Sequence, residues 1–385
     1  MEKKVIITVP KENLPGENRV AIIPDVASKL KKAGFEVQVE NNAGLNAGFT
    51  NEQYESAGAK IVKDIKQLYN SADVVLKVQR PVEHPELKTP ELNLMKEGTI
   101  LITFLYPLHN FKNAKECADK GVNVISMDMI PRTTFAQKMD ALSSQANLAG
   151  YKSVIMCANH LGKIFPLMMT AAGTISPAKV VIMGAGVAGL QALGTAKRLG
   201  AKVEVSDIRP SVKEEVESLG GKFIEVQTDE NMQDEGGYAK EASEEFLKKQ
   251  KDLIFKHITD ADIVVTTALI PGKKAPVLVT EEMVKNMKQG SVVLDMAVEF
   301  GGNCEVSEKD KVVTKHGVTI IGESNLPSLV PTHASEMYSK NILNLLNHIS
   351  KEGKVELDLE DEIIKGALIT HNKEVVNPRI KELLK

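Results

Sequence analysis

The amino-acid sequence predicts an α/β protein built from doubly wound, mostly parallel sheets. Short β-branched runs alternate along the chain with segments whose apolar residues recur at helical spacing. One such run, Val180 to Met183, passes through a glycine-rich turn into a helical segment, as is typical of a parallel α/β unit. The chain has 385 residues, and at about 150 residues per domain two domains are expected.

Composition and charge exclude several functional classes. Hydrophobic residues make up 43% of the chain and charged residues 26%, as in soluble globular proteins, and a net charge of −3 does not favour nucleic acid. The longest uncharged apolar span, Val180 to Ala196, contains four glycines, so the chain is not expected to cross a membrane by itself. The run Val5 to Val9 follows Met1-Glu2-Lys3-Lys4 directly and leaves no room for a signal peptide, which predicts a cytosolic location.

The three cysteines, Cys117, Cys157 and Cys304, lie far apart and form no C-x-x-C pair. Free cysteines of this kind are usually small buried residues, so we expect neither a metal site nor a disulfide framework.

The first third of the chain contains strand-like runs at residues 5–9, 35–39, 73–78, 99–105 and 122–127, with helical segments between them. Lys11 and Arg19 follow the first run, and in open α/β sheets ligands bind at the carboxyl ends of strands. These two cations are therefore either part of an anion site or solvated loop residues. Lys77 lies inside an apolar run, so it should either reach a cleft or pair with an anion.

Four polar residues, Arg132, Gln137, Asp140 and Ser143, lie between an apolar strand and a long helix that continues from Asn147 to Leu161. If the segment is helical, the last three share one face because they are spaced by three residues. The alternative is that a helix begins here, with Asp140 near the positive end of its dipole.

A nucleotide-binding pattern follows the run Val180 to Met183. The turn Gly184-Ala185-Gly186-Val187-Ala188-Gly189 opens a helix, and a second run ends at Asp207, 18 residues beyond Gly189. This spacing matches the dinucleotide fingerprint of the Rossmann fold. Gly184 permits the turn, Gly186 lets the backbone approach a pyrophosphate, and Gly189 lets the helix pack closely on its strand.

The acidic residue at the end of the second run predicts the cofactor. Asp207 would accept hydrogen bonds from the ribose hydroxyls and repel a 2′-phosphate, which favours NAD over NADP. Arg209 weakens that preference, because a nearby arginine can accept a 2′-phosphate.

The remainder of the chain predicts a loop and the return to the first domain. Residues 227–240 are acidic and contain glycines, which indicates a mobile loop, and Tyr238 in it is either a ligand contact or a surface tyrosine. A long helix from Pro331 to about Ser350 leads back toward the first domain. We expect one domain of residues 1–139 and 328–385 and another of residues 140–327, both doubly wound and Rossmann-like, joined by long helices, with a cleft between them.

Several motifs carry a resemblance to a known family. They are Pro10-Lys11-Glu12, Leu76-Lys77-Val78, Leu142-Ser143-Ser144-Gln145, Gly236-Gly237-Tyr238 and Thr266-Thr267-Ala268-Leu269-Ile270-Pro271-Gly272. Together with the fingerprint they resemble the NAD(H)-binding component of proton-translocating NAD(P)+ transhydrogenase, over essentially the whole chain. Alanine dehydrogenases share the same fold family.

The resemblance implies roles for individual residues. Arg132, Gln137, Asp140 and Ser143 would contact the nicotinamide and its ribose, and Gln137 would reach toward NADP(H) on the partner subunit. The residues implied to bind NAD(H) are Gly184, Gly186, Val187, Gly189, Asp207, Ile208, Arg209, Gly237, Tyr238, Ala268 and Leu269.

The resemblance also implies an activity and an assembly. The chain would transfer hydride between NADH and NADP+ together with an NADP(H)-binding subunit and a membrane-spanning subunit, which couples the transfer to proton translocation. It would be a homodimer, peripheral on the cytoplasmic face of the inner membrane.

Two alternatives remain open. Alanine dehydrogenase needs an acid/base group and a carboxylate, and where that family has a histidine and an aspartate this chain has Tyr106 and Glu299. Hydride transfer between two nicotinamides moves no proton at the reacting centre, which favours transhydrogenase. Arg19 and Lys77 resemble the substrate-binding residues of alanine dehydrogenases and would here be mainly structural. The third possibility is a nucleotide-sensing protein without turnover.

Overall fold

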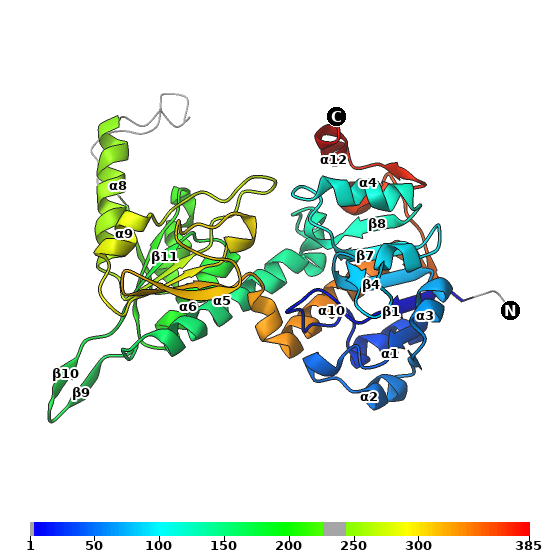
Figure 1. Cartoon of the computed structure of the whole chain (residues 1–385), viewed down its shortest axis with the longest axis horizontal. Helices are drawn as coiled ribbons and strands as arrows, with labels where there is room; N and C mark the ends of the chain where they lie inside the picture. Colours follow the sequence, from blue (N-terminus) through cyan, green and yellow to red (C-terminus); the bar gives the residue numbers. More distant parts are fainter. Residues whose placement is uncertain (1–3, 226–243) are drawn as a thin grey trace. The chain divides into compact units, whose positions relative to one another are not determined.

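A computed structural model describes residues 4–225 and 244–385 (Figure 1). Gly237 and Tyr238 lie outside the described residues. The chain divides into two compact units, unit 1 with Met1–Gln145 and Pro327–Lys385, and unit 2 with Ala146–Leu326. The sequence prediction placed these limits at residues 139/140 and 327/328. The first limit therefore falls inside a helix, α5 (Ala141–His160), rather than before it.

Unit 1 is built on an eight-stranded sheet in the order β21-β20-β8-β7-β4-β1-β2-β3. Its strands are β1 (Ile6–Val9), β2 (Glu36–Glu40), β3 (Lys60–Val62), β4 (Val74–Gln79), β7 (Ile100–Phe104), β8 (Asn123–Ser126), β20 (Leu368–His371) and β21 (Glu374–Val375). The strands from β3 to β8 are parallel. The chain reverses its winding at β1, which lies between β2 and β4, so the fold rule for open sheets predicts a ligand crevice at their carboxyl ends.

Helices cover both faces of the unit 1 sheet because its strands are apolar on both sides. One apolar cluster joins the sheet to α1 (Pro24–Lys32), α10 (Pro331–Ile349) and α11 (Glu362–Ala367). The other joins it to α4 (Phe111–Asp119) and α12 (Pro378–Leu383). Shorter elements complete the unit: α2 (Asn51–Ser56), α3 (Ile65–Ser71), η1 (Leu45–Ala47), η2 (Glu91–Leu94), η3 (Met127–Met129), η4 (Phe135–Met139), η7 (Leu326–Leu329), the hairpin β5 (Glu83–His84) with β6 (Thr89–Pro90), and the hairpin β18 (Ser350–Lys351) with β19 (Lys354–Val355).

The C-terminal segment extends the first sheet. Strand β20 pairs antiparallel with β8, and β21 pairs antiparallel with β20. Thr370 ties the new strand down, because its Oγ1 donates to the Val122 carbonyl at 2.7 Å and accepts from the Val124 N–H at 3.0 Å. Residues more than 240 positions apart therefore share one sheet.

Unit 2 contains a seven-stranded sheet in the order β13-β12-β11-β14-β15-β17-β16. Its strands are β11 (Lys179–Met183), β12 (Lys202–Ser206), β13 (Lys222–Phe223), β14 (Ile263–Thr266), β15 (Val292–Asp295), β16 (Lys311–Lys315) and β17 (Val318–Gly322). All are parallel except the edge strand β16. The prediction of two doubly wound, Rossmann-like domains is confirmed, and in unit 2 the winding reverses between β11 and β14.

The helices of unit 2 cover its two faces in separate groups. Those on one face are the later part of α5, α6 (Val187–Arg198) and α7 (Lys213–Ser218), and those on the other are α8 (Glu244–Thr259) and α9 (Glu281–Asn286). Two short 3-10 turns, η5 (Pro210–Val212) and η6 (Val298–Phe300), follow strands β12 and β15.

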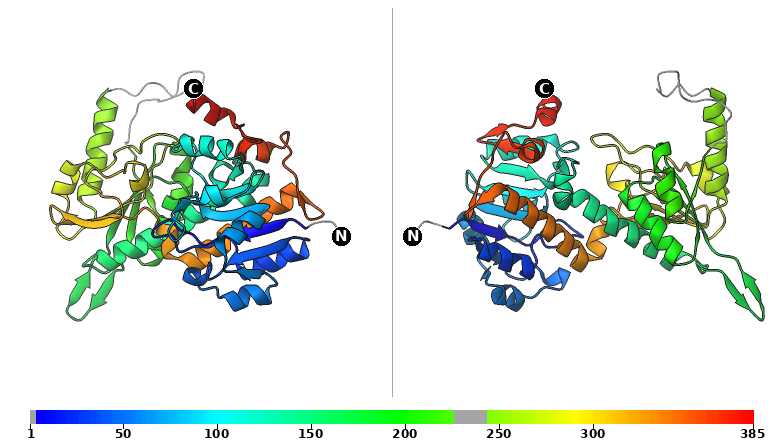
Figure 2. Two further views of the ribbon diagram at one scale, coloured as in Figure 1. Left: turned by 45° about the vertical axis from the view of Figure 1, so that its right-hand side comes forward. Right: turned by 180° about the vertical axis from the view of Figure 1, so that it is seen from behind.

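A hairpin of β9 (Met168–Thr170) and β10 (Gly173–Ile175) projects from the rest of unit 2 (Figure 2). Its side chains are exposed although several are large and apolar; Met169 is 75% and Leu167 56% accessible. No helix in the described parts of the chain combines the length and apolar character needed to span a membrane.

Candidate dinucleotide-binding site

The turn after β11 has the geometry that a dinucleotide site requires. Gly184 adopts φ 112°, a left-handed conformation that favours glycine, and Gly186 caps the start of α6. A Cβ on Gly189 would lie 1.9 Å from the carbonyl oxygen of Gly184, so only glycine permits this contact between helix and turn. A Cβ on Gly186 would meet no atom within 4 Å, so the space beside the first turn of α6 is open. The first N–H groups of α6 lack partners within the helix and favour an anion there.

Asp207 follows β12 and holds this turn in place. Its Oδ2 accepts from the Ala185 N–H at 2.7 Å, and its Oδ1 accepts from the Arg209 N–H at 2.8 Å. The Arg209 guanidinium also donates to both oxygens, at 3.0 Å each. The acid of the fingerprint therefore also links the ends of β11 and β12.

The charge of Asp207 is stabilised despite its burial. Burial by itself raises the pKa of this carboxyl, but the hydrogen bonds from Arg209 and Ala185 outweigh it and hold the pKa below its ordinary value. Asp207 therefore carries its negative charge throughout the neutral range, as repulsion of a 2′-phosphate requires. Arg209 is engaged by this carboxylate rather than held apart from it.

Three of the predicted cofactor contacts are apolar side chains exposed at this edge of the sheet. Val187 is 41%, Ile208 92% and Leu269 49% accessible, and they follow the adjacent strands β11, β12 and β14 respectively. Exposed apolar side chains that gather at one edge indicate a binding surface. Ala268, beside Leu269, is half-buried.

Asn303 supports this edge, and the sequence analysis missed it. Its side chain is fully buried, accepts from the Ala268 N–H at 3.0 Å, and donates to the carbonyls of Ala268 and Pro276 at 2.9 and 2.7 Å. Thr267 adds a hydrogen bond to the Gly184 carbonyl at 3.1 Å. The only signal in the sequence was the position of Asn303 after Gly301-Gly302 at the end of a strand.

The segment with Arg132, Gln137, Asp140 and Ser143 lies in unit 1, and its helical interpretation is wrong. Gln137 lies in the 3-10 turn η4, and the chain changes direction at Asp140, whose ψ is 88°. The Asp140 carboxylate accepts from the Ser143 N–H at 2.9 Å and from the Ser143 hydroxyl at 2.6 Å, so it caps the start of α5. The Arg132 and Gln137 side chains are exposed and make no hydrogen bond or ion pair to any residue within 4–225 and 244–385.

In unit 1, side chains of the chain itself fill the crevice where the winding reverses. Lys77 is fully buried, and its ammonium lies 3.3 Å from Glu12 and 3.1 Å from Glu91. Glu12 also accepts from the Val78 N–H at 2.6 Å at the end of β4. Burial is the main cause that raises the pKa of Glu12 to about 7, and the positive charge of Lys77 opposes this shift. Of the two possibilities for Lys77, the structure shows the ion pair.

Arg19 is 4% accessible and belongs to the same buried region. Its guanidinium donates to both Glu17 oxygens, at 2.8 and 2.6 Å, and to the Gln145 side chain at 2.7 Å. Arg19 is thus not a solvated loop residue, and its anion is Glu17.

The positions that distinguish alanine dehydrogenase hold residues with other engagements. Tyr106 stacks on Phe104 with 5.6 Å between ring centroids and adopts φ 50°. Glu299, in unit 2, pairs with Lys309.

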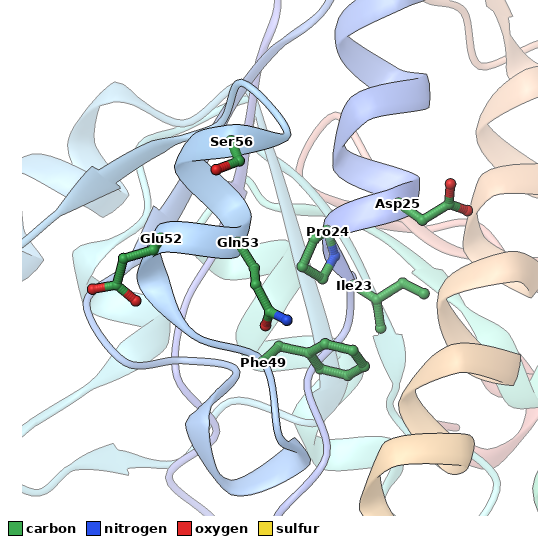
Figure 3. A pocket seen from close by; sticks show the side chains of 7 residues that line it. All are labelled: Ile23, Pro24, Asp25, Phe49, Glu52, Gln53 and Ser56. Atoms are coloured by element: carbon green, nitrogen blue, oxygen red, sulfur yellow. The ribbon is translucent and has the colours of Figure 1, made fainter.

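A separate hollow of about 470 Å³ lies between α1 and α2 in unit 1 (Figure 3). Its polar groups serve the helices around it, because Gln53 completes a capping box with Thr50 and Asp25 pairs with Lys29. It contains none of the predicted site residues.

The fold and the site define an α/β protein with a Rossmann-type dinucleotide-binding unit. The chain belongs to the alanine dehydrogenase/PNT family: the N-terminal domain model of that family matches residues 8–149, and the C-terminal domain model matches residues 153–378.

Three known proteins illustrate the similarity. An NAD(P) transhydrogenase subunit alpha of Rhodospirillum rubrum is 50% identical over 97% of this chain and 98% of its own. A transhydrogenase structure from Sinorhizobium meliloti superposes with a TM-score of 0.86 at 43% identity, over 96% of this chain and all of that one. The alanine dehydrogenase of Bacillus subtilis is 32% identical over 96% of this chain and 92% of its own.

Proposed function

We propose that the chain is the NAD(H)-binding subunit of a proton-translocating NAD(P)+ transhydrogenase and transfers hydride between NADH and NADP+ on a partner subunit. The observation that carries this proposal is the 50% identity with a transhydrogenase subunit over nearly the full length of both chains, against 32% with an alanine dehydrogenase.

Unit 2 fits NAD(H) at the carboxyl ends of β11, β12 and β14. The open space beside Gly186 and the start of α6 accommodate a pyrophosphate. Asp207 accepts from the ribose hydroxyls, and Val187, Ile208 and Leu269 supply apolar surface for the adenosine half. Bound NADH supplies the hydride.

Unit 1 contributes Arg132 and Gln137 by position rather than by proton transfer. Both are exposed and without a partner among residues 4–225 and 244–385, so they are available to a bound nucleotide or to another subunit. Direct transfer between two nicotinamides gains its rate from holding the rings together, and effective molarities for such alignment are large. Gly237 and Tyr238 complete the proposed site from the segment outside the described residues.

The proposal extends to the assembly. NADP(H) would be bound by a second subunit, a third would span the membrane, and this chain would lie on the cytoplasmic face of the inner membrane. We propose a homodimer contact at the β9–β10 hairpin, because exposed apolar residues on a projecting two-stranded ribbon are better stabilised by a second copy than by water.

The test combines the chain with its NADP(H)-binding and membrane subunits, NADH and NADP+, and follows NADPH formation. A second reaction contains the chain alone with NADH, pyruvate and ammonium. We expect turnover in the first reaction and none in the second. Arg132→Ala should lower the first rate, whereas Arg379→Ala, which removes an exposed arginine from α12, should not.

Two outcomes contradict the proposal. Turnover with pyruvate and ammonium alone identifies an alanine dehydrogenase. NADH binding without hydride transfer in the complete assembly identifies a nucleotide-sensing protein.

A further inference from the structure

Helix α10 holds the end of η4 through two side-chain amides that converge on one carbonyl. The Nδ2 of Asn341 donates to the Lys138 carbonyl oxygen at 2.9 Å, and the Nδ2 of Asn344 donates to the same oxygen at 3.2 Å. The last carbonyls of a short helical turn have no partner within the turn. Here residues about 200 positions later in the chain supply the missing donors.

Asn341 also binds the other side of the break at Asp140. Its Oδ1 accepts from the Ser144 hydroxyl at 2.8 Å, in the first turn of α5. One amide, only 7% accessible, therefore fixes the carbonyl before the break and the hydroxyl after it. Because a buried amide with both ends bonded has little freedom, it sets the angle between η4 and α5.

The start of η4 has a second attachment to α10. The ring of Phe135 meets the ring of His348 edge-on, with 5.4 Å between centroids, although Phe135 is 58% accessible. His348 is held in turn by the Asp361 carboxylate at 2.9 Å, and the Lys138 ammonium lies 5.0 Å from the Phe135 ring centroid. Both ends of the turn that contains Gln137 are thus attached to α10.

Gln137 depends on these attachments for its position. A five-residue 3-10 turn has poor hydrogen-bond geometry and is not stable by itself. The Gln137 side chain has no partner of its own among residues 4–225 and 244–385, so its location follows from the backbone on either side.

We propose that Asn341 and Asn344 are positioning residues for the hydride transfer, which hold the η4 turn so that Gln137 meets the second nucleotide at the correct distance. This inference rests on the proposed function. Misplacement by about 1 Å can cost roughly 100-fold in rate without a change in substrate affinity. The effect should therefore appear in kcat and leave NADH binding unchanged.

The experiment uses Asn341→Ala and Asn344→Ala in the complete assembly. Both variants should lower the rate at saturating NADH by roughly 10- to 100-fold, while the NADH dissociation constant changes by less than about threefold. The matched control is Asn286→Ala, because Asn286 donates to the carbonyl four residues earlier in α9, as Asn344 does in α10, but does not contact η4. Asn341→Gln, which retains an amide, should recover part of the rate.

A second measurement does not depend on activity. A nitroxide label on Gln137→Cys reports the mobility of the turn, and the native thiols should not compete because all three are buried, which raises the pKa of Cys117 and of Cys304 to about 12. The label should become more mobile when Asn341→Ala or Asn344→Ala is added, and Asn286→Ala should leave it unchanged.

The outcomes separate this inference from the proposed function. If the unmodified assembly transfers no hydride, the proposed function fails, and the label alone decides whether α10 holds the turn. An unchanged label in both variants overturns the inference whatever the rate. A fall in NADH affinity that accounts for the whole loss of rate also overturns it, because a general structural defect then explains the effect.

Discussion

Removal of the ammonium of Lys77 tests whether the unit 1 crevice is structural. In Lys77→Met, Glu12 and Glu91 remain buried without the cation that lies 3.3 and 3.1 Å away. Breaking a buried ion pair by removing one partner costs about 3–5 kcal/mol. We expect that loss in the free energy of unfolding at pH 8, measured by urea denaturation with circular dichroism because the chain contains no tryptophan.

The loss should depend on pH in a specific direction. The folded-state pKa of Glu12 is about 7, above its ordinary value of 4.5, and Lys77 keeps it from rising further. A carboxyl with a raised pKa contributes stability that is present below the unfolded value and is lost as the pH rises through the folded value. At pH 5 Glu12 is largely protonated and needs its cation less, so the loss should be smaller than at pH 8 by about 1–3 kcal/mol.

Two further variants make this prediction refutable. Lys29→Met breaks an exposed pair with Asp25 and should cost less than about 0.5 kcal/mol. Adding Glu12→Gln to Lys77→Met removes an uncompensated carboxylate and should restore more than about 1 kcal/mol at pH 8. A loss in Lys77→Met below about 1 kcal/mol, or an equal loss at pH 5 and pH 8, would refute the reasoning.

Three predictions concern the nucleotide site. Gly189→Ala places a Cβ 1.9 Å from the Gly184 carbonyl oxygen and should weaken NADH binding at least about tenfold in a fluorescence titration, whereas Gly194→Ala, whose Cβ meets only Arg198 at 3.6 Å, should leave binding unchanged and gain up to about 1 kcal/mol of stability. Asp207→Asn removes the charge that opposes a 2′-phosphate and releases Arg209, so the preference for NADH over NADPH should fall at least about tenfold in competitive binding; an unchanged ratio would show that Asp207 does not select the cofactor. Asn303→Ala removes three hydrogen bonds and should destabilise the protein by about 2–4 kcal/mol in urea denaturation, against less than about 0.5 kcal/mol for the exposed Asn286→Ala.

Local chemistry explains why the fingerprint could be predicted from the sequence. A β-branched run, a glycine turn and a helical period each depend on residues within one short segment. The turn at Gly184 and the close packing at Gly189 follow from the absence of a Cβ, whatever the rest of the chain does. The confirmed prediction of two parallel α/β sheets rests on the same local alternation of strands and helices.

The interpretation of residues 132–143 could not be decided locally. A spacing of three residues fits one face of a helix and also fits a cap at Asp140, and a capping interaction is worth only about 1 kcal/mol. The contacts that hold the break come from Asn341 and Asn344, about 200 residues away. Asn303 was missed for a similar reason, because an asparagine after two glycines is ordinary in a turn and its role depends on the distant loop that it binds.

The sequence by itself determined where the chain forms strands, the glycine turn and the acid that follows it, because these depend on side-chain shape and period over a few residues. It also showed that Lys77 needed either a cleft or an anion. Only the tertiary structure decided between them, since β1 and β4 are brought side by side by a topology that places Glu12 and Glu91 against the same ammonium. Pairing energies between distant groups exist only after the chain has folded, so no local pattern contains them.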